Sequence, residues 1–173
     1  MLYGTVNQNL AGLASELDRK AIQPIVLAGA NVDSSLVFTS AGLATSASPN
    51  TAVKTGGSTT YYIVDGVLGS IASAINMTAL VGTVVNATFN VFAFFVDRAG
   101  TLTSAMGAPG ASLGAVTFPG TPLKTACIGF VIINPTGTGN FVGGNTPMAD
   151  GTVVPNAVYV NITGGMDASS LLG

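Results

Sequence analysis

The sequence predicts a mainly β fold, an antiparallel β-sandwich or a barrel-like domain, preceded by an N-terminal helix and an extended arm. Two observations predict the β domain. Short apolar runs recur from residue 59 onward with turn residues between them, and no helical pattern separates these runs, which favours antiparallel strands. A third observation predicts the helix, because apolar residues near the start of the chain recur at helical spacing.

Residues 1–58 are predicted to form the helix, the arm and a linker. The apolar stripe of the helix consists of Leu10, Leu13, Ala14, Leu17 and Ala21. Pro24 ends it, and the Ser-, Thr- and Gly-rich stretch 40–58 is typical of a linker or a long loop. Two interpretations of the stripe remain open: it packs on its own domain, or it docks on a partner. On the second, the partner-binding residues are Leu10, Leu13, Leu17, Arg19 and Lys20.

Residues 59–173 are predicted to form the antiparallel β domain. Asp65-Gly66 lies between two apolar runs and predicts a type I′ hairpin turn, which requires positive φ at both central residues. A second turn is expected at 97–100. The expected strands are 59–64, 67–68, 86–96, 101–103, 126–133, 141–142 and 157–162, together with an extended stretch at 36–39 in the preceding arm.

Charge is scarce in this chain. It has five Lys or Arg and seven Asp or Glu among 173 residues, or 7%, whereas soluble domains carry about a quarter. Because 48% of the residues are hydrophobic, we expect much of the surface to be covered by other subunits. The net charge of −2 and the lack of a basic run argue against binding to nucleic acid or anionic lipid. The uncharged stretch 66–96 contains too many Asn and Thr residues for a membrane span.

The residues that most enzymes use are largely missing. The chain has no histidine and a single cysteine, Cys127, which lies in a strand-like run and is expected to be a buried, inert thiol. Gly110–Gly114 matches the G-x-S-x-G pattern of a serine nucleophile, but that site needs a histidine base and a strand before the serine. Pro109 precedes Gly110 and strand-like residues follow Gly114, so Ser112 is expected in a loop. We therefore expect no catalysis, no metal and no cofactor.

Three carboxylates occupy turn-like positions. Asp65, Asp97 and Asp150 each stand beside or near glycine, where Asp side chains accept hydrogen bonds from the local backbone. We expect them to have these turn roles. A pair of carboxylates acting in glycoside hydrolysis is a remaining alternative, because two such groups meet only in space.

Two stretches of the β domain carry a resemblance to a known group. Asn90–Gly110 contains a core strand followed by Asp-x-x-Gly-Thr-Leu, and Ala126–Asn161 contains Ile-Gly-Phe-Val-Ile-Ile and Phe-x-Gly-Gly. These motifs resemble those of small virion-associated proteins of tailed bacteriophages, and the resemblance extends over residues 59–163. It implies a capsid decoration (cement) protein or a head-fibre subunit. The first of these is preferred here, as a protein on the virion surface that binds the major capsid protein and is most often a trimer. No catalytic residue is carried over with it.

A receptor- or glycan-binding fibre subunit is the alternative function. Its candidate site residues are Tyr61, Tyr62 and Tyr159, although all three lie in strand-like runs where packing in a sheet is expected instead. In either case we expect a homo-oligomer.

Overall fold

The structure is a computed structural model that describes residues 35–148 and 150–164. These residues form a mainly β fold of short antiparallel strands with one turn of 3₁₀ helix, which confirms the predicted fold class at that level. The elements are β1 (Leu36–Val37), β2 (Ala44–Thr45), β3 (Val53–Lys54), β4 (Thr60–Val64), β5 (Val67–Ile71), β6 (Thr83–Val84), β7 (Asn90–Asp97), β8 (Leu102–Met106), η1 (Leu113–Ala115), β9 (Thr125–Ile133), β10 (Phe141–Val142) and β11 (Val158–Asn161).

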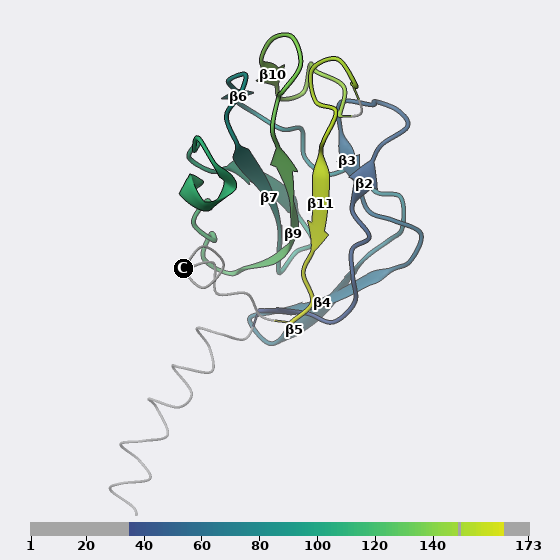
Figure 1. The fold of residues 1–173 in the computed structure, drawn as a ribbon. Coiled ribbons are helices and arrows are strands. Elements are labelled where there is room, and N and C mark those ends of the chain that lie inside the picture. The colour runs from purple at the N-terminus through teal and green to yellow at the C-terminus, as the bar shows by residue number, and fades with distance from the viewer. Residues whose placement is uncertain (1–34, 149, 165–173) are drawn as a thin grey trace, which may run out of the picture. The chain divides into compact units, whose positions relative to one another are not determined.

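The strands form one large sheet and three smaller ones. The four-stranded sheet has the order β11-β9-β7-β8 and the three-stranded sheet the order β1-β4-β5, while β2 pairs with β3 and β6 with β10. Every pairing is antiparallel, and in the described part of the chain no sheet closes into a barrel. Figure 1 shows β7, β9 and β11 side by side, with β4 and β5 at one end of them.

The main core lies on the inner face of the four-stranded sheet. Because side chains alternate along a strand, Phe92 and Phe94 point to the same face of β7, and both are fully buried. They join a cluster that includes Tyr62 and Val64 of β4. The rings of Phe92 and Phe141 pack edge to face at 5.9 Å between centroids, an arrangement that aromatic pairs favour.

The outer face of the same sheet carries a second apolar cluster. Val91, Ala93 and Phe95 of β7 belong to it, and Val116 of the β8–β9 connection is buried against them. Phe118 of that connection packs edge to face on a phenylalanine of β9 at 5.2 Å. The two clusters explain why the sequence of β7 is continuously apolar: both faces of this strand are covered.

A β-bulge in β9 keeps both clusters in register. The pairing of β9 with β7 shifts between Phe94 and Phe95, so that Phe94 lies opposite Gly129 and Phe95 opposite Cys127. Gly129 has φ of +155°, and a Cβ there would lie 2.5 Å from the Val160 carbonyl oxygen. Only glycine fits this position, because the backbone conformation and the space both exclude a side chain.

The predicted hairpin turn is confirmed. Asp65 and Gly66 join β4 to β5 with φ values of +50° and +73°, as a type I′ turn requires. The strand predicted at 86–96 begins later, at Asn90. Ala87 has φ of +61° and its amide donates to the Pro135 carbonyl at 2.7 Å, so residues 86–87 form a turn, and Phe89 then pairs with Gly110 just before β7.

The stretch 40–58, predicted as a linker, is packed into the β fold. Leu43 and Val53 are buried in the main core, and the backbone N–H of Leu43 donates to Asn161 Oδ1 at 2.8 Å. The prediction was a linker or a long loop. The linker interpretation was wrong, because a few well-placed apolar residues bury a segment whose overall composition is polar. The compact unit accordingly begins at Ser35.

The predicted N-terminal helix and the extended stretch 24–28 lie outside the described residues. Within 35–148 and 150–164, no helix is long and apolar enough to cross a membrane.

Candidate functional site

The outward face of the three-stranded sheet carries a row of apolar side chains. Leu36 of β1 lies opposite Ile63 of β4, which in turn lies opposite Leu68 of β5. Leu36 and Ile63 are partly exposed, and Leu68 is 65% exposed. We call Leu36, Ile63 and Leu68 the apolar row. Its position is set by strand alternation, because their neighbours Val37, Tyr62 and Val64 point into the core.

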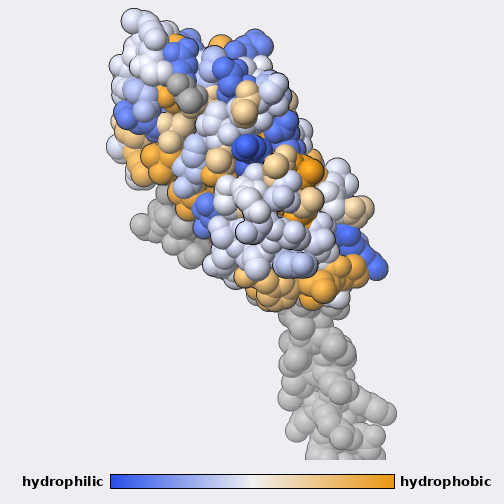
Figure 2. All heavy atoms as spheres, turned by 90° about the vertical axis from the view of Figure 1, so that its right-hand side faces the viewer, coloured by the Kyte–Doolittle hydropathy of each residue, from blue (hydrophilic) through white to orange (hydrophobic). Residues whose placement is uncertain are grey.

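Two aromatic residues extend the apolar row. Phe38 and Tyr61 are each about half exposed, and the Phe38 amide donates to the Tyr61 carbonyl at 2.8 Å, which holds the two segments together. Figure 2 shows hydrophobic residues in several separate patches, with weakly polar residues and smaller strongly hydrophilic patches between them. Exposed apolar side chains that share one sheet face are typical of a surface that binds another protein.

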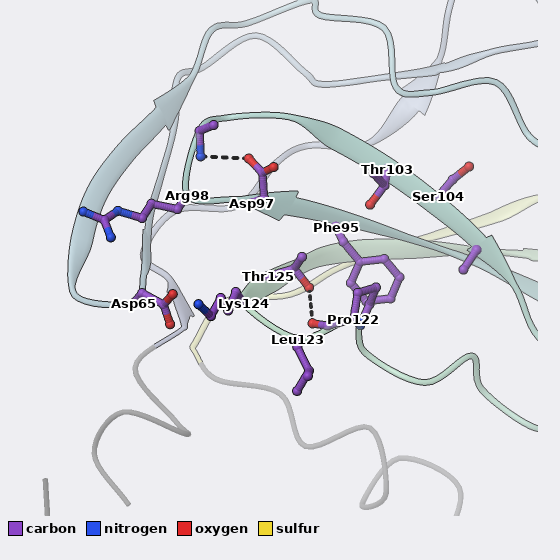
Figure 3. Close-up of a pocket in the computed structure, with 12 residues that line it drawn as sticks. Asp65, Phe95, Asp97, Arg98, Thr103, Ser104, Pro122, Leu123, Lys124 and Thr125 are labelled. Carbon is purple, nitrogen blue, oxygen red and sulfur yellow. Dashed lines mark hydrogen bonds between the residues drawn. The ribbon is translucent and has the colours of Figure 1, made fainter. Parts of the chain in front are cut away.

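A hollow of about 560 Å³ lies where three turns meet. It is lined by the β4–β5 turn, the β7–β8 hairpin, residues 122–124 before β9 and Thr125 at the start of β9. Figure 3 shows the charged side chains of Asp65, Arg98 and Lys124 on one side of the hollow, and Phe95 and Pro122 on the other. The hollow is the part of the outer sheet face that the β8–β9 connection leaves open. We refer to it below as the hollow.

All three carboxylates that we assigned to turns lie in or beside turns, and Asp97 and Asp150 accept hydrogen bonds from the local backbone as expected. Asp65 is the first residue of the type I′ turn. Asp97 Oδ1 accepts hydrogen bonds from the amides of Ala99 and Thr101, each at 2.8 Å, and Asp150 Oδ1 accepts one from the Thr152 amide at 2.8 Å. Among the described residues, no group of three or more Cys, Asp or Glu side chains is placed to hold a metal ion.

The charge of Asp97 stabilises the β7–β8 turn. The backbone hydrogen bond from Thr101 is the largest influence that lowers the pKa of this carboxyl below its ordinary value of 3.8. Because the folded protein holds the proton less tightly than the unfolded chain, the stabilisation is present above pH 3.8 and is lost as the pH falls through the lowered pKa.

We expect Asp97→Asn to lower the melting temperature slightly at neutral pH. The asparagine keeps an acceptor oxygen but loses the charge, so the difference from wild type should shrink as the pH falls below 3.8. Thermal unfolding followed from neutral to acid pH measures this difference. A difference that is equally large in acid would mean that the charge of Asp97 plays no part.

Ser112 lies in the loop that we expected, but a different element follows it. The residues after Ser112 form η1 and not a strand, and the Ser112 side chain makes no capping hydrogen bond. Cys127 lies inside β9 and is buried, and loss of hydration raises the pKa of its thiol to about 11. The thiolate needed for nucleophilic attack is therefore scarce near neutral pH.

The three tyrosines predicted as a glycan site do not share one surface. Tyr62 is buried in the main core, and its ring lies against Gly69. Tyr159 is partly buried and its hydroxyl is 2.7 Å from the Thr45 hydroxyl. Tyr61 alone of the three is exposed, beside the apolar row.

The five residues predicted to contact a partner, Leu10, Leu13, Leu17, Arg19 and Lys20, lie outside the described residues. Sequence reasoning missed both the apolar row and the hollow. The row had a signal in the sequence, because Leu68 follows a recognised hairpin turn in a strand where side chains alternate between the two faces. The hollow had no signal in the sequence, because its three turns are far apart in the chain.

No protein-family model, curated protein or solved structure matches this chain.

Proposed function

We propose that this chain is a structural virion protein that decorates the capsid of a tailed phage and stabilises it by binding across neighbouring capsid subunits. In this proposal its β domain is a sandwich of two main sheets and assembles as a homotrimer on the shell. The observation that carries the proposal is the apolar row with Phe38 and Tyr61 beside it, on a body with very few charges.

The apolar row is suited to binding a protein surface. Burying apolar area stabilises a contact by about 25 cal/mol for each Å² removed from water, and the row stands on a paired sheet that loses little conformational freedom on binding. The apolar stripe lies in residues 1–34, which precede the row in the sequence. A shell surface that binds the stripe and the row together would gain from both contacts.

A decoration protein needs no chemistry of its own. By binding the assembled shell and not its separated subunits, it shifts the equilibrium toward the closed shell. The roles of the described polar groups agree with this proposal. The carboxylates of Asp97 and Asp150 accept backbone hydrogen bonds, and the Cys127 thiol is buried. We propose no catalytic residue.

The alternative function, a receptor- or glycan-binding fibre subunit, has one observation in its favour. Tyr61 exposes about half of its surface next to Phe38, and sugars stack on exposed aromatic rings. Images of purified virions separate the two functions. Density for this chain over the faces of the capsid supports the decoration protein, whereas density only at a vertex or at the tail contradicts it.

We expect Leu68→Asp to weaken binding to the shell by roughly 10-fold or more, because a buried leucine contributes about 1.5–3 kcal/mol and each 1.4 kcal/mol is a factor of ten. The matched control is Val81→Asp, since Val81 is 79% exposed and lies outside the apolar row. Co-sedimentation with shells stripped of this protein measures both variants. Equal binding by Leu68→Asp and wild type would exclude the apolar row as the contact.

A further inference from the structure

Leu123 is the most exposed large apolar side chain of the described residues, at 94%. It stands between Pro122, whose ring restricts the backbone, and Lys124, which has φ of +60°. The Thr125 hydroxyl donates to the Pro122 carbonyl at 2.7 Å and closes this turn. The turn therefore holds the Leu123 side chain exposed to water. This arrangement costs free energy, because an apolar side chain is hydrated and because Lys124 has a strained backbone conformation.

The hollow next to Leu123 offers an apolar place for such a side chain. Phe95 and Ala105 belong to the apolar cluster of the outer sheet face and also line the hollow. Its volume of about 560 Å³ is in the range of sites that enclose part of a ligand. Leu123 lies at the rim, as Figure 3 shows.

The charges around the hollow are balanced. Asp65 and Asp97 supply two negative charges, and Arg98 and Lys124 supply two positive charges. A nucleic acid or an anionic membrane would require an excess of positive charge. A second copy of the same surface would instead meet each charge with an available opposite charge, which is the requirement for self-association.

We infer that Leu123 of one copy of this chain inserts into the hollow of a second copy, with Asp65, Asp97, Arg98 and Lys124 forming ion pairs around it. Each copy has one Leu123 and one hollow. In a closed oligomer, each copy therefore inserts its Leu123 into one neighbour and accepts the Leu123 of a neighbour in its own hollow. The proposed function includes an oligomer, and this inference assigns the contact that forms it.

Two variants of the purified full-length chain test the inference. Leu123→Asp removes the inserted side chain, and Thr103→Trp fills the hollow from an exposed position on its wall. Light scattering should show an oligomer for the wild type and a mass near 17.1 kDa for each variant. We expect self-association to weaken roughly 10- to 100-fold. Val81→Asp, which changes an exposed apolar residue elsewhere, should retain the wild-type mass.

A mixture of the two variants gives the sharper result. The Thr103→Trp chain still offers Leu123, and the Leu123→Asp chain keeps the space of the hollow because only a residue at its rim changes. The two chains should therefore form a one-to-one complex that neither forms alone. A monomeric wild type, an oligomeric Leu123→Asp chain or a mixture that stays monomeric would each overturn the inference. The measurement uses no capsid, so its failure is distinguishable from failure of the proposed function, which is read from shell binding.

Discussion

Gly129→Ala should destabilise the protein by about 2–6 kcal/mol, a large effect for a single methyl group. Two costs add. A non-glycine residue at φ of +155° costs on the order of 1–3 kcal/mol. The new Cβ would also lie 2.5 Å from the carbonyl oxygen of Val160, in the backbone of β11, so β11 must shift away from β9, and a forced shift of this kind costs typically another 1–3 kcal/mol.

Thermal unfolding of Gly129→Ala should show a melting temperature lower by on the order of 10 °C. Gly120→Ala is the matched control, because a Cβ at Gly120 meets nothing within 4 Å. This control should have almost no effect or stabilise slightly, since alanine restricts the unfolded chain. If both variants melt together with the wild type, the bulge does not require glycine.

Local signals in the sequence predicted the parts of the fold that short-range chemistry determines. The Asp65-Gly66 turn was predictable because positive φ at two successive positions selects residue types directly. The strands β7 and β9 were predictable because they are long apolar runs without helical spacing. Each of these features depends on residues close together in the chain.

Long-range contacts determine the features that the sequence did not predict. The segment 40–58 has the composition of a linker, yet Leu43 reaches Asn161 across 118 positions of sequence. The β-bulge could not be predicted from the sequence either. Gly129 lies within an apolar run, and nothing in that run indicates that Leu43 and Val160 will pack around it. In both cases a partner distant in the sequence decides the structure.

The two candidate sites also differ in whether local sequence or long-range contacts determine them. The apolar row depends on which face of the three-stranded sheet is covered. Strand alternation places Leu68 on the face opposite to Ile71, the buried residue of β5. Leu123 carries no such pattern, because its exposure depends on the turn closed by Thr125. Scarcity of charge predicts partner surfaces but does not locate them.

Leu17→Asp should abolish most of the attachment to the shell while leaving the β domain folded, which is the second large effect that we expect. Leu17 lies on the predicted apolar stripe, outside the described residues. If the stripe docks on the capsid, Leu17→Asp removes a buried leucine side chain from the contact. It also places a carboxylate there, which must lose its bound water for the contact to form. Together these costs predict binding weaker by roughly 100-fold, and Leu13→Asp should behave alike.

Ser15→Asp is the matched control, because it adds the same charge to the same predicted helix but off the stripe. It should bind shells as the wild type does, and co-sedimentation compares all three chains. Melting temperature separates the two interpretations of the stripe. If Leu17→Asp lowers it by more than roughly 5 °C, or about 1 kcal/mol, while Ser15→Asp does not, then the stripe packs on its own domain and does not serve attachment. An unchanged melting temperature with lost binding identifies the stripe as part of the contact with the shell.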